Sequence, residues 1–138
     1  DMDQHNRVCA QIDLDAIAYN MEQMKDQIGK EARLIAVIKT DGYGHGAVPI
    51  ARMFETFSYV WGYAVACIEE AVSLRKEGIK KPILVLGCVF PDQYETMIKN
   101  EIRAAVYTKE MAEGMSDEAV RQGKMLISTL RSIPEWDG

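Results

Sequence analysis

Long apolar runs, a basic surface and a secretion signal are all missing from this sequence of 138 residues. No apolar stretch approaches the roughly 20 residues that a helix needs to span a bilayer. No signal peptide is recognisable, so we expect a cytoplasmic protein without a membrane partner. Lys and Arg number 16 against 21 Asp and Glu, and the net charge is −5 without a basic stripe. This balance argues against nucleic acid as a partner.

Cysteine is also scarce. The three cysteines, Cys9, Cys67 and Cys88, are an odd number and lack the spacing of metal ligands. Neither a disulfide framework nor a zinc site is therefore indicated, and we expect no metal. Cys67 and Cys88 each follow a predicted strand. A reactive thiol at such a place needs a cationic neighbour, which the sequence does not reveal.

What the chain does contain is a repeated pattern of a strand followed by a helix. Four short apolar runs that begin at residues 34, 60, 82 and 103 are predicted strands, and an amphipathic helix follows each. The starts lie about 21 to 26 residues apart, which is the period of parallel βα units with right-handed crossovers. Residues 125–130 fit the place of a fifth strand. The predicted class is α/β with a parallel sheet.

The stretch from Leu34 to Gly46, LIAVIKTDGYGHG, carries the first candidate chemistry. Its apolar start, Leu34 to Ile38, is predicted to be a parallel strand that is buried on both faces. Lys39 follows with no turn signal, so its amine is expected at the carboxyl end of the strand, where α/β proteins keep their chemistry. Desolvation there lowers the pKa of a lysine, which makes Lys39 a candidate Schiff-base residue. From position alone, a lysine that reaches solvent or pairs with Asp41 is the alternative.

Glycine at positions 42, 44 and 46 alternates with Tyr43 and His45 in the turn that follows. Glycine allows positive φ and close backbone approach, and Tyr43 and His45 have no obvious core to fill on such a loop. Residues 36–46, AVIKTDGYGHG, resemble the pyridoxal-phosphate attachment signature of alanine racemases. Residues 11–20, QIDLDAIAYN, resemble the amino-terminal signature of the same family. Two motifs in the right order make the resemblance specific, and it extends over about residues 7–124.

The resemblance implies a function and a set of site residues. It implies that Lys39 binds pyridoxal 5′-phosphate as a Schiff base and acts as one base of racemisation, and that Tyr43 hydrogen-bonds the cofactor phosphate. It places Leu86, at the end of the third predicted strand, in the cofactor pocket, although core packing explains Leu86 equally well. His45 also matches the motif, and stabilisation of the turn is the alternative to a role in orienting Tyr43.

The resemblance also implies a substrate and partners. The substrate would be alanine, interconverted between its L and D forms to supply cell-wall precursors. The protein would be a homodimer or a higher oligomer, in which a tyrosine of the other subunit supplies the second base.

The same resemblance implies roughly the first half of a TIM (β/α)8 barrel, truncated after four or five units. Residues 1–29 are expected to form a strand, from Val8 to Leu14, and an amphipathic helix. Residues 30–124 would form four βα units, and residues 125–138 a possible fifth strand and a divergent tail. Half a barrel leaves an open sheet edge and uncovered apolar inner faces.

Two alternatives remain open. Residues 128–138, STLRSIPEWDG, depart from the family pattern, and the later cofactor-binding loops are missing, so these 138 residues are expected to be inactive alone. They would then bind pyridoxal phosphate weakly or not at all. A dinucleotide-binding domain is the other alternative, because Gly42-x-Gly44-x-x-Ala47 follows a predicted strand. That interpretation needs an acidic residue at the end of the next strand, where the chain has Cys67.

Overall fold

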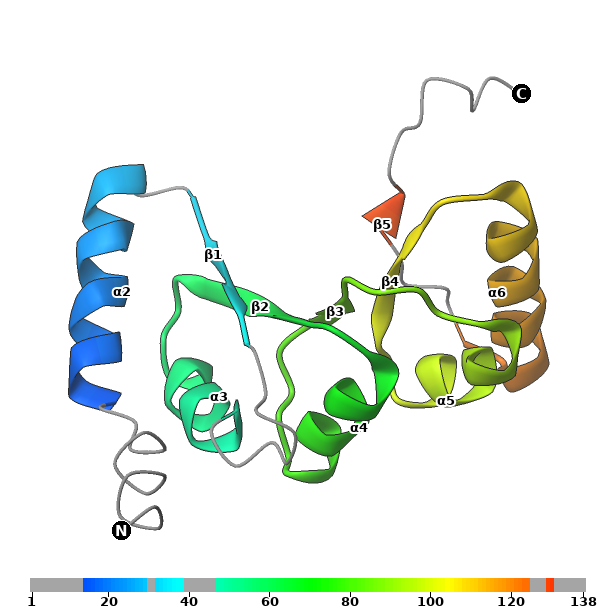
Figure 1. Cartoon of the computed structure of the whole chain (residues 1–138), viewed down its shortest axis with the longest axis horizontal. Helices are drawn as coiled ribbons and strands as arrows, with labels where there is room; N and C mark the ends of the chain where they lie inside the picture. The colour runs from blue at the N-terminus through cyan, green and yellow to red at the C-terminus, as the bar shows by residue number, and fades with distance from the viewer. Residues whose placement is uncertain (1–13, 30–31, 39–46, 125–128, 131–138) are drawn as a thin grey trace, which may run out of the picture.

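The computed structural model describes residues 14–29, 32–38, 47–124 and 129–130. They form an α/β fold around one sheet of five strands in the order β1-β2-β3-β4-β5 (Figure 1). Along the chain the elements are α2 (Leu14–Ile28), β1 (Leu34–Val37), α3 (Ala47–Glu55), β2 (Val60–Val65), α4 (Ile68–Lys76), β3 (Ile83–Val85), the 3₁₀ helix η1 (Pro91–Gln93), α5 (Tyr94–Lys99), β4 (Arg103–Val106), α6 (Lys109–Gln122) and β5 (Thr129–Leu130).

Every neighbouring pair of strands is parallel, which confirms the predicted βα repeat. The observed strands begin at residues 34, 60, 83 and 103, within one residue of the predicted starts. Helix α6 begins and ends where it does for identifiable local reasons. The Thr108 hydroxyl accepts a hydrogen bond from the Met111 N–H, and Gly123 ends the helix with a φ of 67°.

The prediction of a strand from Val8 to Leu14 is wrong at Leu14, the one residue of this segment that the structure describes. Leu14 was expected to end a strand, but it is the first residue of α2, with Asp15 in the first helical turn. Alternation over so few residues does not distinguish the two elements, whereas a carboxylate in the first turn favours the helix through its dipole. Residues 8–13 of that predicted strand lie outside the described residues. So do residues 125–128 of the predicted fifth strand, of which Thr129–Leu130 is observed.

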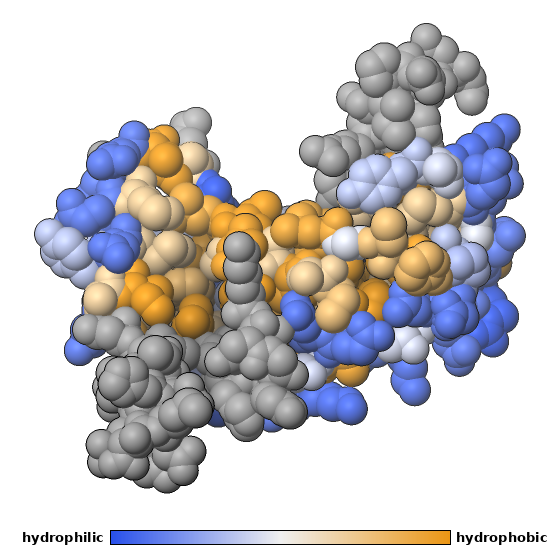
Figure 2. All heavy atoms as spheres, viewed as in Figure 1, coloured by the Kyte–Doolittle hydropathy of each residue, from blue (hydrophilic) through white to orange (hydrophobic). Residues whose placement is uncertain are grey.

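The two faces of the sheet are covered unequally. Helices α3, α4 and α5 lie along one side of it, while α2 and α6 stand at its two ends (Figure 1). Strand residues that face the helices are buried: Ala36, Tyr63, Val65, Ile83, Val85, Ala104 and Val106. We call the opposite side the inner face. It carries Ile35, Val37, Leu84 and Leu86, and Figure 2 shows apolar residues gathered across the middle of the molecule.

Burial of Leu34 to Ile38 on both faces, predicted from their continuous apolar run, is therefore wrong for two residues. Ile35 is 47% exposed and Val37 is 60% exposed, because no described element lies over the inner face. Ala36 and Ile38, which alternate with them, are buried against the helical side. The uncovered apolar inner face that half a barrel predicts is thus present in the described residues.

Polar side chains tie the amino-terminal ends of the units together. The Arg75 guanidinium, near the end of α4, donates hydrogen bonds to the carbonyls of Ile79, Lys81, Asn100 and Glu101 at 2.8–3.0 Å. These carbonyls precede β3 and β4. One half-buried side chain therefore holds the starts of two strands against the helix between them.

Tyr63, at the centre of the sheet, links β2 to α3 through hydrogen bonds. Its ring is fully buried, and its hydroxyl lies 2.7 Å from Glu55 Oε2 and 2.8 Å from the Ala51 carbonyl, both on α3. Glu55 Oε1 accepts a hydrogen bond from the Lys80 N–H at 2.7 Å. Burial raises the pKa of Tyr63 far above its ordinary value of 10.0, and the Glu55 carboxylate raises it further.

We expect Tyr63→Phe to change both the free energy of unfolding and its dependence on pH. At pH 8 the variant loses about 1–2 kcal/mol, because the Glu55 carboxylate and the Ala51 carbonyl lose their donor. Native Tyr63 keeps its proton above pH 10, where the unfolded chain releases it. The stability from this group is therefore complete below pH 10 and is lost as the pH rises, by up to about 1.4 kcal/mol per pH unit. Urea unfolding at pH 8 and at several values above pH 10 measures the slope.

Tyr19→Phe is the matched control, since Tyr19 is 65% exposed. It should keep the wild-type slope above pH 10. The slope of Tyr63→Phe should be shallower without reaching zero, because burial also raises the pKa of Tyr59 and Tyr94. Equal slopes for wild type and Tyr63→Phe would contradict the assignment.

Candidate functional site

Strand β1 leads directly to the first predicted site residue. The Ile38 N–H donates a hydrogen bond to the Ala64 carbonyl at 2.9 Å, so pairing with β2 continues to the residue before Lys39. The described chain thus reaches the carboxyl-terminal edge of the sheet at Ile38. Lys39, Tyr43 and His45 themselves lie outside the described residues.

Leu86, the third predicted site residue, is described. It follows Val85, whose buried side chain faces the helices, so Leu86 belongs to the inner face. Its N–H donates to the Val65 carbonyl at 2.8 Å, and its side chain is 48% exposed. The described residues do not pack Leu86 into a core. It presents apolar surface at the same edge of the sheet that β1 reaches at Ile38.

Gly87 marks a close approach of two chains at this edge, which the sequence analysis did not identify. The Gly87 N–H donates to the Ala66 carbonyl at 3.0 Å, and a Cβ at position 87 would lie 2.4 Å from that carbonyl oxygen. A side chain there would push β2 and β3 apart just beyond Leu86. The signal was available, because a glycine that ends a strand pattern often indicates close backbone contact.

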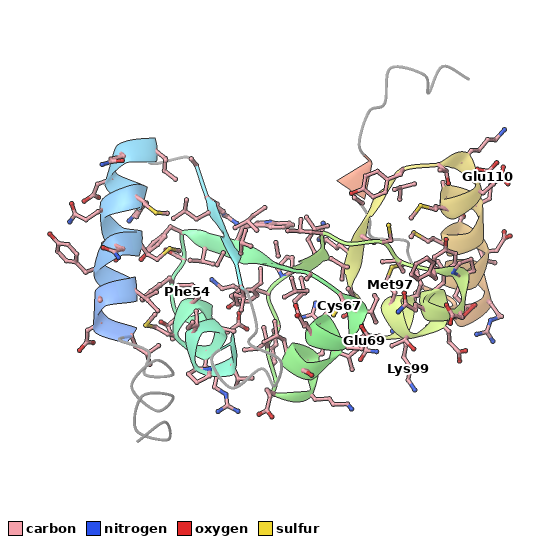
Figure 3. The ribbon with its side chains drawn as sticks, in the orientation of Figure 1. Phe54, Cys67, Glu69, Met97, Lys99 and Glu110 are labelled. Atoms are coloured by element: carbon pink, nitrogen blue, oxygen red, sulfur yellow. The ribbon has the colours of Figure 1, made fainter. Side chains whose placement is uncertain are left out.

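The end of β2 carries a thiol among carboxylates. Cys67 is the residue before α4, and Figure 3 shows it with Glu69 where β2 passes into that helix. Burial raises the pKa of the Cys67 thiol, and the charges of Glu69 and Glu70 add to the rise, while a backbone hydrogen bond lowers it in part. A raised pKa reduces the thiolate fraction on which nucleophilicity depends. Cys67 therefore lacks the activation that a catalytic cysteine needs.

Glu70 turns back onto the strand that precedes its helix. Its Oε2 accepts a hydrogen bond from the Ala66 N–H at 3.0 Å. One of the two acids that follow β2 thus binds the backbone of its own turn. This contact gives no support to the dinucleotide-binding alternative, which needs an acid that projects toward a ribose.

An apolar groove of about 440 Å³ lies between α2 and β1. Met21 and Ile17 line it from α2, Ile35 from β1 and Phe54 from α3, and Figure 3 shows Phe54 on the side of α3 that faces α2. Met24, which also lines the groove from α2, is 46% exposed. The apolar face of α2 is therefore only partly used by the described residues.

The described part of the site can hold a planar and partly apolar group, anchored by a residue just beyond β1. Val37 and Leu86 offer exposed apolar walls on the inner face. In the described ranges, no three His, Cys, Asp or Glu side chains come together as metal ligands. None of the described helices is long and apolar enough to span a membrane. Lys39 and Tyr43, which the resemblance implies for the covalent bond and the phosphate contact of a cofactor, fall in residues 39–46, outside the described residues.

Solved structures with the same fold include an alanine racemase and a histidine racemase. Alanine racemase from Clostridium difficile 630, in complex with cycloserine, superposes with a TM-score of 0.79 at 35% identity, over 85% of this chain and 31% of that one. Histidine racemase from Leuconostoc mesenteroides superposes with a TM-score of 0.69 at 27% identity, over 83% of this chain and 30% of that one. The sheet and helices are therefore those of the amino-terminal part of a racemase TIM barrel.

Sequence relatives agree with the structures. Alanine racemase from Symbiobacterium thermophilum is 40% identical over 124 residues, which are 90% of this chain and 32% of that relative. Alanine racemase 2 from Oceanobacillus iheyensis is 45% identical over 103 residues, which are 75% of this chain and 26% of that relative. The chain thus spans about a third or less of the relatives it matches. The family described as "Alanine racemase, N-terminal domain" matches residues 12–130, and the chain belongs to the alanine racemase family.

Proposed function

We propose that this chain supplies the cofactor-binding amino-terminal part of a pyridoxal-phosphate-dependent amino acid racemase. The observation that carries the proposal is the path of β1. The strand pairs with β2 up to Ile38, beside an open apolar inner face, and the next residue is the lysine of the attachment signature. Lys39 binds the cofactor, Tyr43 hydrogen-bonds its phosphate, and Leu86 forms one wall of its pocket.

Each of these residues has a stated chemical role in the proposal. When bound, pyridoxal phosphate supplies the electron-withdrawing ring that delocalises the negative charge left after removal of the α-proton. In the whole enzyme, where further chain would cover the inner face, the Lys39 amine would be desolvated, so that its neutral form is favoured and it can take up or return a proton. Leu86 keeps water from one side of the reacting group. Tyr43 fixes the phosphate end and thereby the position of the ring.

Alanine is the proposed substrate, because the curated relatives named above are alanine racemases. The histidine racemase shares the same amino-terminal fold, so we propose that residues outside this part choose between side chains. The second base, from a partner subunit of a homodimer, also belongs to the proposed whole enzyme. Supply of D-alanine to the cell wall in the cytoplasm is its proposed role.

The 138 residues alone are proposed to be inactive. Their inner face is open in the described residues, with Val37 60% exposed and Leu86 48% exposed. A site that stays wet on this side neither desolvates the lysine nor holds a substrate between two bases. Residues 30–124, which supply the four βα units in this proposal, form the edge of the site rather than all of it.

Reductive trapping tests the Lys39 assignment. The purified chain, incubated with pyridoxal phosphate and then with borohydride, should gain the mass of one pyridoxyl group on the peptide that contains Lys39. Lys39→Ala should lose the adduct at this position, whereas Lys76→Ala, at the exposed end of α4, should keep it. Digestion and mass spectrometry locate the adduct. A stoichiometric adduct elsewhere in Lys39→Ala, with the same yield as wild type, would refute the role of Lys39.

Racemisation by the chain alone tests the second claim. With pyridoxal phosphate and L-alanine, we expect the purified chain to form D-alanine no faster than the Lys39→Ala variant, as measured by chiral chromatography. The reason is the missing second base and the open inner face. Turnover that disappears only in Lys39→Ala would mean that these residues complete a site by themselves, and the claim of inactivity would be abandoned.

A further inference from the structure

A pocket of about 490 Å³ opens at the amino-terminal ends of β2 and β3. Its walls include Arg33, Glu55, Ser58, Trp61, Lys81 and Pro82. Strand β2 has six residues, so roughly 20 Å of extended chain separate this pocket from the edge that leads to Lys39. The pocket therefore lies outside the proposed racemase site.

Lys81 places a fixed positive charge in the wall of the pocket. Its Nζ donates hydrogen bonds to the carbonyls of Phe57 at 2.5 Å and of Val60 at 2.6 Å. An ammonium has three N–H groups, so one is left for a further acceptor. Burial lowers the pKa of Lys81, Glu55 raises it, and the positive charge of Arg33 lowers it. Both cations line the same pocket.

The Glu55 carboxylate, which lines the pocket, already accepts hydrogen bonds from neutral donors. Glu55 Oε1 accepts from the N–H groups of Lys80 at 2.7 Å and Lys81 at 3.3 Å, and Oε2 lies 2.7 Å from the Tyr63 hydroxyl. Neither Lys81 nor Arg33 forms an ion pair with it. Arg33 is exposed and has no hydrogen-bond or ion-pair partner within the described ranges. Its guanidinium is therefore available to an anion.

Trp61 gives the pocket an apolar wall. The register pairs Leu34 with Val60 and Ile35 with Gly62, so Trp61 is the extra residue of a bulge in β2. Such bulges turn a side chain away from the regular alternation. The Arg103 guanidinium lies 4.9 Å from the centre of the Trp61 ring, which adds a third positive charge nearby. A ligand here would meet cations on one side and an aromatic surface on another.

We propose that this pocket binds a small organic carboxylate with an apolar body. The Arg33 guanidinium and the remaining Lys81 N–H bind the carboxylate, because a guanidinium matches the two oxygens of a carboxylate in a bidentate pair. Trp61 and Pro82 bind the apolar body, and Ser58 also lines the pocket. The positive charges in the pocket exceed the single carboxylate of Glu55, although the chain as a whole carries −5. Binding of an anion relieves the repulsion between Arg33 and Lys81.

Titration of the chain with benzoate tests the proposal through the indole N–H resonance of Trp61. The sequence has two tryptophans, so Trp136→Phe leaves one indole signal in a ¹H–¹⁵N spectrum. Benzoate should shift this signal saturably. Arg33→Gln should weaken binding about tenfold, as expected from loss of one charge-assisted pair. Arg52 is an exposed residue of α3 that pairs with Glu77. Arg52→Gln should therefore leave the affinity unchanged.

Benzamide and inorganic phosphate separate the two parts of the recognition. Benzamide has the ring without the charge, and phosphate has the charge without the ring, so each should bind at least about tenfold more weakly than benzoate. Equal binding of benzoate and benzamide, equal loss in Arg33→Gln and Arg52→Gln, or no saturable shift would overturn the proposal. Lys39→Ala should bind benzoate as tightly as the wild type does. The benzoate result is therefore independent of whether Lys39 binds the cofactor.

Discussion

A parallel sheet is stable only when both of its faces are covered, and this requirement governs the described structure. Helices α3, α4 and α5 cover one face of the sheet, and the residues that point toward them, such as Tyr63 and Val85, are fully buried. The inner face has no such layer among the described residues. Ile35, Val37 and Leu86 consequently keep about half of their side-chain surface exposed. The same open face that makes the sheet incomplete gives the candidate site its apolar walls.

The amino-terminal and the carboxyl-terminal ends of the strands have different roles. At the amino-terminal ends, Arg75 and Glu55 bind backbone groups of the neighbouring units, and the carbonyl of Pro82 packs closely against β2 next to the bulge at Trp61. A Cβ at Gly62 would lie 2.3 Å from the Pro82 carbonyl oxygen, so glycine is required there. At the carboxyl-terminal ends the strands pass into the turn before each helix, where Leu86 and Cys67 lie. Barrel proteins use these ends for stability and for chemistry respectively.

Electrostatics at the two ends differ as well. At the carboxyl-terminal edge the described ionisable side chains near Cys67 are acidic, and burial together with their charges raises the pKa of its thiol. At the amino-terminal edge Arg33 and Lys81 line a pocket with one carboxylate, Glu55, that neutral donors already satisfy, and Arg103 lies over the Trp61 ring of the same pocket. In this pocket Arg33 and Lys81 therefore form no ion pair with the Glu55 carboxylate. A buried hydrogen-bond network and an open cationic pocket share the same Glu55 side chain.

The sequence by itself determined the order of the elements, the parallel sheet and the family. Strand starts were predictable because apolar runs recur at the βα period, and α6 was predictable because Thr108 and Gly123 cap it locally. Leu86 was identified only through resemblance, since an apolar residue at a strand end looks the same in a core and in a pocket. The tertiary structure decided which face of each strand is covered, for example the exposure of Val37 in a continuously apolar run. It also decided the meeting of Arg33, Trp61 and Lys81, because these residues come from three separate βα units and no local pattern links them.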